Sequence, residues 1–159
     1  MISRDQNPFP HDSDRHEIWD LLMRRDFEAF LSADWSLTEP DFLPEPFQGI
    51  DCRKNANPAQ WCLRYPSLKS YRDEWLRQAA DFKKLQLKTI SKRDFLFQSA
   101  TLVDVKIEEG RALAQKKFDG SAETLDGAPL CLLWQTVYFL QRNAGRWKIT
   151  GFVGYLPYT

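Results

Sequence analysis

The stretch GRWKITGFVGYLPYT, residues 145–159, ends the chain and decides its fold. Chain ends are usually polar and poorly ordered, but this one is long, aromatic and interrupted by glycines. Trp147 and Ile149 alternate with polar residues, so the stretch is predicted to be the last strand of a sheet, entered through a turn at residues 143–145. Gly151 inside such a strand is typical of a bend, or of a place where another backbone approaches closely.

The segments before this strand follow a clear order along the chain. Three earlier strands are predicted at residues 95–107, 111–118 and 130–142, with hairpin-type turns between them. Three helices are predicted ahead of the strands: one that begins near residue 14, a short one at 27–33 for which Asp26 is interpreted as the cap, and a long one at 67–85. Helices that precede an antiparallel meander predict an α+β fold with the helices packed on one face of the sheet.

The length and composition predict a single domain with a large core. The chain has 159 residues, of which 43% are hydrophobic and 14% aromatic, and one domain of this size can bury about two thirds of its unfolded surface. Residues 1–13 are polar and are interpreted as a flexible N-terminal arm, which leaves 14–159 as the domain. Residues 36–66 hold five of the nine prolines and are interpreted as a packed, proline-rich loop insertion.

Charge and cysteine content limit the classes of partner. The 22 basic residues balance the 22 acidic ones, which argues against a nucleic-acid or membrane partner because both favour a basic surface. The start of the chain shows no apolar signal segment, and no run approaches the length of a membrane span. Three cysteines without a CxxC pair indicate free thiols in a reducing compartment, so we expect a cytoplasmic protein.

Two local motifs and their order resemble the nuclear transport factor 2-like superfamily. The first runs from Arg25-Asp26-Phe27 to ADWSLTEP at residues 33–40, and is similar to that superfamily's helix break and its entry into the first strand. The second is GRWKITGF at residues 145–152, similar to the closing strand. The resemblance covers residues 14–157, and the SnoaL-like branch fits it best. It implies three helices on a strongly curved antiparallel sheet of four to six strands, forming a cone with a pocket. Since this fold carries many functions, it does not settle the activity.

The resemblance points to Glu39 as a candidate catalytic base. In the ketosteroid isomerase branch, a carboxylate precedes a proline at the corresponding place, and Glu39-Pro40 matches it. An apolar pocket could raise the pKa of such a carboxyl towards neutrality. The branch's oxyanion donors are replaced by Ile18 or Trp19 and by Val137, which argues against that particular reaction. The alternative for Glu39 is an exposed loop carboxylate, and this is the more common situation for such a residue.

The aromatic residues of the helices and strands are candidates for a ligand pocket. The expected lining comprises Trp19, Phe30, Trp75, Phe82, Gln135 and Tyr138, and the alternative is that these side chains simply fill the cone. The sequence contains only two histidines and no clustered ligands, so no metal site is expected. It shows no phosphate-binding glycine loop or nucleophile elbow either, so no cofactor is expected.

Two functions are compatible with these observations. The first is a protein that binds an unidentified apolar or aromatic small molecule, and acts on it as a lyase, isomerase or cyclase with Glu39 as base. The second is a non-catalytic binding or assembly module. Residues 130–140 and 147–158 are apolar on both faces, and an apolar face that the helices do not cover marks an interface. We therefore expect a homodimer through the sheet face.

Overall fold

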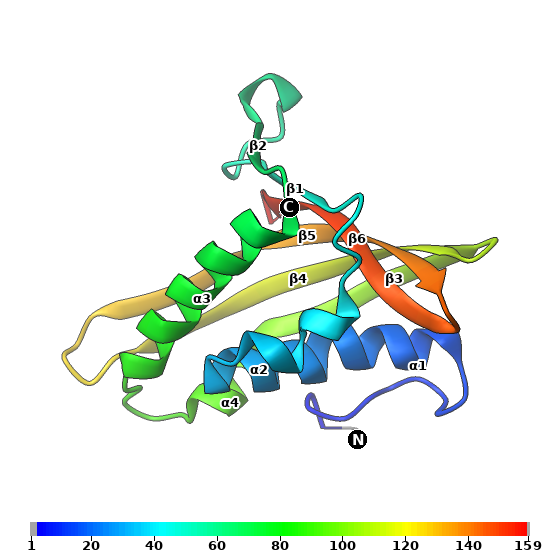
Figure 1. Cartoon of the computed structure of the whole chain (residues 1–159). Coiled ribbons are helices and arrows are strands. Elements are labelled where there is room, and N and C mark those ends of the chain that lie inside the picture. The colour runs from blue at the N-terminus through cyan, green and yellow to red at the C-terminus, as the bar shows by residue number, and fades with distance from the viewer. Residues whose placement is uncertain (1–2, 159) are drawn as a thin grey trace.

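A computed structural model of the chain describes residues 3–158. It has the predicted α+β order, with most helices before the long strands (Figure 1). The helical segments are α1 Asp14–Trp19, the π-helical turn η1 Asp20–Arg25, α2 Asp26–Ser32, α3 Leu68–Lys84 and α4 Lys92–Ser99, with short 3-10 turns η2 Trp35–Leu37, η3 Glu39–Asp41 and η4 Pro58–Gln60. The strands are β1 Gln48–Asp51, β2 Cys62–Tyr65, β3 Ala100–Glu108, β4 Arg111–Glu123, β5 Pro129–Asn143 and β6 Arg146–Leu156.

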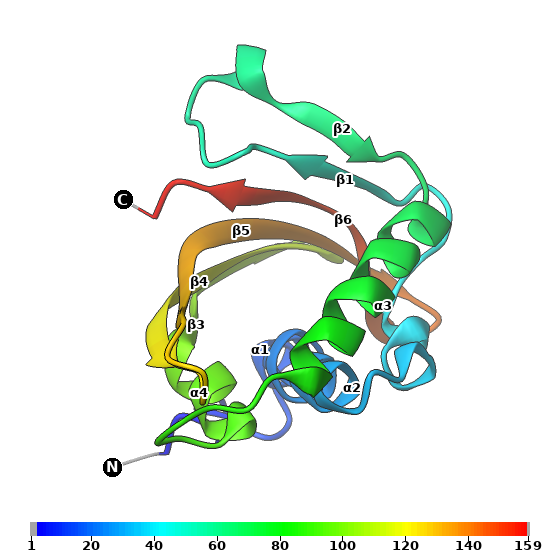
Figure 2. The ribbon, with the colours of Figure 1, turned by 90° about the vertical axis from the view of Figure 1, so that its left-hand side faces the viewer.

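The six strands form one curved sheet with the order β2-β1-β6-β5-β4-β3. Figure 2 shows this sheet bending around α1, α2 and α4, with α3 lying across the open side. The predicted cone and the number of strands are confirmed. The sheet is mixed rather than purely antiparallel, because β1 runs parallel to β6. No strand was predicted at that edge, and therefore no parallel pair.

Gly151 explains how the parallel pair forms. A Cβ atom at this position would lie 2.5 Å from the carbonyl oxygen of Gln48, so only glycine lets the two backbones come this close. The expectation that a glycine of the last strand admits another backbone is thus confirmed.

Two segments differ from the sequence prediction. Residues 95–99, predicted as the start of a strand, belong to the helix α4, for which Ser91 is the N-cap. The consecutive side chains Phe95, Leu96 and Phe97 are all buried, which a half-exposed strand cannot achieve because its side chains alternate. The proline-rich insertion contains β1 and β2, which pair as an antiparallel hairpin at the sheet edge.

The long helix α3 agrees closely with the prediction. Ser67 caps it by accepting a hydrogen bond from the amide of Ser70, and the Ser70 side chain accepts one from the amide of Ser67 in return. This reciprocal capping box fixes the start of the helix. Trp75, Ala79 and Phe82 form its buried stripe, and Figure 2 shows α3 lying across the hollow side of the sheet.

The turn η1 separates two neighbouring charged residues. In an α-helix the amide of Asp26 would donate to the carbonyl of Leu22, but here it donates to Met23. The Asp26 carboxylate is directed to the sheet, where it meets a lysine of β4. Arg25 instead pairs with Asp41 of η3, through contacts of 2.6 and 3.1 Å. Successive side chains of a helix point about 100° apart, so these two adjacent charges reach different partners.

Asp41 joins three distant parts of the chain. Its side chain is 2% exposed and accepts hydrogen bonds from Arg25 and from Arg146 of β6, the latter at 2.9 Å. The arrangement leaves both carboxylate oxygens paired, as a buried charge requires. We call Arg25, Asp41 and Arg146 the outer ion cluster; it ties η1 and η3 to the start of the last strand.

The arm before the first helix also makes contacts. Arg4 donates to the carbonyl of Gln98 at 3.0 Å and to the hydroxyl of Thr101 at 2.8 Å. Phe9 packs against one of the hydrophobic clusters of the core. Across residues 3–158, none of the helices combines the length and the apolar composition that crossing a membrane requires.

Candidate functional site

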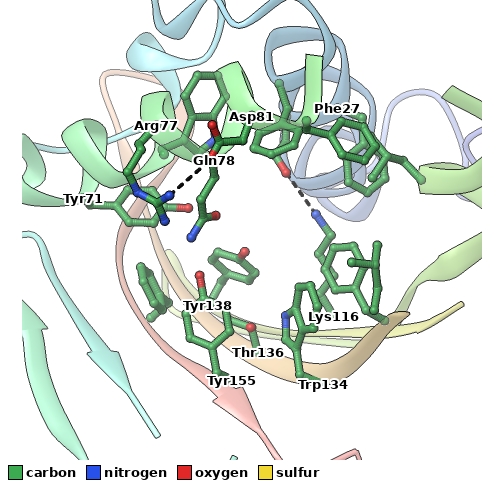
Figure 3. A pocket seen from close by; sticks show the side chains of 18 of the residues that line it. Phe27, Tyr71, Arg77, Gln78, Asp81, Lys116, Trp134, Thr136, Tyr138 and Tyr155 are labelled. Atoms are coloured by element: carbon green, nitrogen blue, oxygen red, sulfur yellow. Dashed lines mark hydrogen bonds and ion pairs between the residues drawn. The ribbon is translucent and has the colours of Figure 1, made fainter. Parts of the chain in front are cut away.

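A cavity lies between the helices and the hollow face of the sheet. Its volume is about 370 Å³, within the usual range for small-molecule sites. Figure 3 shows side chains converging on it from α2 and α3 on one side and from the sheet strands on the other. The lining residues are Asp26, Phe27, Phe30, Tyr71, Trp75, Arg77, Gln78, Asp81, Phe82, Leu85, Leu96, Lys116, Phe118, Leu132, Trp134, Thr136, Tyr138, Phe152 and Tyr155.

Four of the six side chains expected in the pocket line this cavity: Phe30, Trp75, Phe82 and Tyr138. Trp19 lies elsewhere, in a buried cluster with Met23 and Phe27. Gln135 lies on the other face of β5, where its amide donates to the carbonyl of Pro157 at 2.7 Å. Strand alternation explains this difference, since Gln135 is an odd-numbered position whereas the lining residues Trp134 and Thr136 are even-numbered.

Glu39 lies outside the cavity lining. It opens the 3-10 turn η3 and its side chain is exposed. The buried acid of this segment is Asp41, two residues further on, which belongs to the outer ion cluster. A role for Glu39 as a base stays a prediction, and its position gives it no contact with a ligand in the cavity.

Lys116 is the buried cation of the cavity. It lies in the middle of β4 between Ala114 and Phe118 on the inward face, and its side chain is 1% exposed. Its ammonium group donates to the carbonyl of Leu22 at 2.5 Å and to the carboxylate of Asp26 at 3.2 Å. Burial lowers the pKa of Lys116, and the charge of Asp26 opposes this effect.

Aromatic rings surround the ammonium group. Lys116 Nζ lies 4.4 Å from the ring centroid of Phe27 and 5.2 Å from that of Phe118. Contacts with aromatic faces stabilise a cation that has left water. Phe118 in turn stacks on Trp134, with 4.6 Å between centroids. The amine is therefore held at an aromatic wall of the cavity.

Asp26 is the more accessible member of this pair. Its side chain is 28% exposed and lines the cavity, and its hydrogen bond within the described residues comes from Lys116. The expected capping role is wrong, because α2 has no side-chain cap and the carboxylate points to the sheet. Asp26 thus presents a carboxylate, held by a buried cation, to anything that occupies the cavity.

Three tyrosines direct their hydroxyl groups to the same cavity. Figure 3 shows Tyr71 from α3 and Tyr138 and Tyr155 from the sheet around one space. Burial raises the pKa of Tyr71 and of Tyr138 well above the ordinary value, and the negative charge of Asp26 adds to the effect in both. Both hydroxyls therefore stay protonated at neutral pH and can donate hydrogen bonds.

Tyr155 reaches the cavity through an irregular backbone. Its φ angle is 60°, in the left-handed region that residues other than glycine seldom adopt. The register between β5 and β6 shifts in this part of the ladder, and such bulges commonly redirect a side chain next to a functional site. Tyr155 and Gln78 of α3 both line the cavity, so strand and helix meet at this space.

Asp26 and Lys116 were not predicted from the sequence as site residues. Lys116 and Lys117 are adjacent in a strand, and the sequence could not decide which of them points inward. A signal was available in Ala112, Ala114 and Phe118, small or apolar residues that alternate in phase with Lys116. Within residues 3–158, no group of three or more histidine, cysteine or acidic side chains is placed to hold a metal ion.

Comparisons with known proteins agree on the fold. No protein-family model matches the sequence, and a search of curated proteins found no match. Among solved structures, a proposed dehydratase of the nuclear transport factor 2-like family from Streptomyces avermitilis has a TM-score of 0.63 at 13% identity, covering 92% of this chain and 97% of its own. A nuclear transport factor 2-like protein of unknown function from Shewanella baltica has a TM-score of 0.54 at 11% identity, with coverage of 92% and 95%.

A third structure shows the range of activities suggested for such proteins. A proposed aromatic ring hydroxylase from Novosphingobium aromaticivorans has a TM-score of 0.53 at 12% identity, covering 92% of this chain and 90% of its own. At these identities the likeness concerns the fold, which carries many functions. Together with the curved sheet and the cavity that it encloses, these matches show that the chain has the nuclear transport factor 2-like fold.

Proposed function

We propose that the cavity binds a small aromatic or largely apolar molecule and that Asp26 exchanges a proton with it. The single observation that carries the proposal is a cavity of about 370 Å³ with aromatic walls and a buried cation, Lys116, paired with Asp26 in its lining. The other ion pair of the lining, Arg77 with Asp81, is exposed on both sides. A charge pair is costly to bury. The presence of the Asp26–Lys116 pair at the aromatic wall of the cavity is therefore a reason to assign it a chemical role.

The arrangement suits proton transfer next to a carbonyl group. The Asp26 carboxylate can accept a proton from carbon, while the hydroxyls of Tyr71 and Tyr138 can donate to the oxygen on which negative charge develops. The negative charge of Asp26 acts on both tyrosines, so the three groups share one neighbourhood. Lyase, isomerase and cyclase reactions use this step, and the resemblance to SnoaL-like proteins implies the same classes. The names of a proposed dehydratase and a proposed ring hydroxylase among the similar structures are compatible with it.

Binding is tested first, with 2-naphthol as an aromatic probe that contains no carbonyl. We expect saturable quenching of tryptophan fluorescence, because Trp75 and Trp134 line the cavity. The variant Thr136→Phe fills the space opposite Lys116 and should reduce affinity at least tenfold. Val137→Phe, on the next residue of the same strand and outside the lining, is the matched control. Equal binding by both variants, or no saturable binding by the wild type, would refute the site.

Proton transfer is tested with 2-tetralone, an aromatic ketone, in deuterated water. The wild-type protein should accelerate exchange of the protons next to the carbonyl, as followed by proton NMR. A protein that binds 2-naphthol but leaves the exchange rate at the buffer value would retain the binding function and lose the catalytic one.

A second candidate function concerns the outer face of the sheet. We propose that the chain forms a homodimer through this face. Leu133 and Phe139 of β5 are each 41% exposed there, and a shallow hollow beside Phe139 is bordered by Ile50 and Val153. Exposed apolar groups on neighbouring strands favour an isologous contact. Sedimentation of the wild type and of Phe139→Glu at micromolar concentration tests this, with a monomeric wild type as the contrary result.

A further inference from the structure

We propose that Lys116 is a nucleophile that captures an aromatic aldehyde or ketone in the cavity as an imine. This inference rests on the aromatic-binding site proposed above and names its substrate class: aryl carbonyl compounds. It assigns to the amine a covalent role that the proton transfer by Asp26 does not require. A lysine acts as a nucleophile only as the free amine, because its ammonium form has no lone pair. Burial favours the free amine, so buried lysines suit imine formation.

Lys116 differs from every other lysine in the described chain by its position. It is the one buried lysine there; Lys92, Lys117 and Lys148 are half-buried and the remaining ones are exposed. Figure 3 shows Lys116 at the edge of the cavity, and its amine donates a hydrogen bond to Asp26. A carbonyl compound that enters the cavity therefore meets this amine and no other.

The surroundings of the amine provide for the required loss of a proton. Burial lowers the pKa of Lys116, which increases the fraction of free amine. The Asp26 carboxylate lies 3.2 Å from Nζ and can take the proton that the ammonium group gives up. The carbonyl of Leu22, at 2.5 Å, keeps the amine in place. The Asp26 amide donates to the carbonyl of Met23 and not to that of Leu22.

The aromatic walls favour an aryl group next to the reacting carbon. The ring of Phe27 lies 4.4 Å and that of Phe118 5.2 Å from Nζ, and Trp134 extends the wall by stacking on Phe118. An aryl ring attached to the carbonyl would contact these faces in offset or edge-to-face geometry.

The reaction balances without any further reagent. The ammonium proton of Lys116 passes to Asp26, and the free amine adds to the carbonyl carbon to give a carbinolamine. Asp26 returns the proton to the departing hydroxyl group, the carbon–oxygen bond breaks, and water leaves. The products are a protonated imine and water, with one positive charge before and after the reaction. A protonated imine withdraws electrons from the adjacent carbon, so the neighbouring C–H becomes more acidic and easier for Asp26 to deprotonate.

The test uses the full chain, 2-naphthaldehyde and sodium cyanoborohydride at neutral pH. Hydride reduction of the imine fixes it as a secondary amine, and intact-mass analysis should show one adduct with the mass of the aldehyde less one oxygen atom. Peptide mapping should place it at Lys116 with at least tenfold preference over any other lysine. The variant Lys116→Arg keeps a cation but cannot form an imine, so it should lose the adduct. Lys117→Arg, on the opposite face of the same strand, should keep it.

The outcomes separate this inference from the proposed function. If Lys116 is modified selectively and 2-naphthol suppresses this modification, both the nucleophile and the binding site are supported. Saturable binding of 2-naphthol with no adduct, or with adducts spread over surface lysines, overturns the nucleophile and leaves the binding site standing. Absence of binding by either compound overturns the site itself. Because the mapping is done on the wild-type protein, the result does not depend on whether Lys116→Arg folds.

Discussion

Two buried ion pairs begin at neighbouring residues of one helical segment and have opposite characters. Arg25 pairs with Asp41 in the outer ion cluster, where the acid is 2% exposed and both of its oxygens are bound by arginines. Asp26 pairs with Lys116, where the base is 1% exposed and the acid remains accessible from the cavity. The first arrangement leaves nothing free for a ligand, whereas the second presents a carboxylate to one. Burial alone therefore does not distinguish a structural charge from a reactive one; the distinction lies in which partner keeps an open side.

The largest effect is expected from removing the acid of the outer ion cluster. Asp41→Ala leaves Arg25 and Arg146 without their shared partner and removes the side-chain link between η3 and β6. Breaking a buried pair in this way costs about 3–5 kcal/mol. Urea unfolding followed by circular dichroism measures the loss. At temperatures where the variant is folded, binding of 2-naphthol should match the wild type, and a variant as stable as the wild type would contradict the structural role.

A second effect, on the reaction rate, is expected at the cavity pair. Asp26→Asn keeps the shape of the side chain but removes its ability to accept a proton, so exchange of 2-tetralone protons should slow by about 100-fold, as for loss of a general base. Its unfolding free energy should also fall, because the buried Lys116 loses its counter-ion, so exchange is measured at temperatures where the variant is folded. Exchange at the wild-type rate would exclude Asp26 as the base.

The lysine of the same pair should give a pH-dependent difference in stability. Lys116→Met removes the hydrogen bond to Leu22, at a cost of about 1–2 kcal/mol near neutral pH. The pKa of Lys116 is lowered in the folded protein from its ordinary 10.5, so in the interval below 10.5 the unfolded chain binds more protons than the folded one. The wild type should therefore gain stability relative to Lys116→Met as the pH rises through this interval. A difference that stays constant with pH, or that moves the other way, would contradict the lowered pKa.

The smallest effect is expected at Glu39. Glu39→Gln should leave 2-naphthol affinity, ketone exchange and stability unchanged within error, since the side chain is exposed and lies outside the cavity lining. Loss of ketone exchange in this variant, with binding retained, would restore Glu39 as the base that the family resemblance implied.

The sequence predicted those parts of the fold in which the local pattern and the tertiary environment agree. The strand beginning at Arg146 and the helix capped by Ser67 are examples, because one face of each is apolar at the correct period. Phe95, Leu96 and Phe97 were misassigned, since three consecutive apolar residues have no period that separates helix from strand. The strand Gln48–Asp51 has only four residues, and its pairing with β6 depends on Gly151 far along the chain.

The site was harder to predict than the fold. The aromatic lining could be found because Phe30, Trp75 and Phe82 lie on the apolar stripes of their helices. Asp26 and Lys116 are polar residues that occupy inward positions, against the usual rule that charges stay outside. Their pairing joins residues that lie 90 positions apart, and neither is a recognisable motif by itself.

The π-helical turn at Asp20–Arg25 has a consequence for insertions and deletions in this gene. Such a turn holds one more residue than the α-helix that would replace it, so losing one codon here would produce a more regular helix. That regular helix would also rotate the residues before the deletion by about 100° relative to the residues after it. Either α1 would no longer bury Ile18 and Trp19, or Asp26 would no longer face Lys116. A deletion that makes the helix more regular would thus disrupt the site and be selected against. The irregular turn is therefore the part of the helix least free to vary in length.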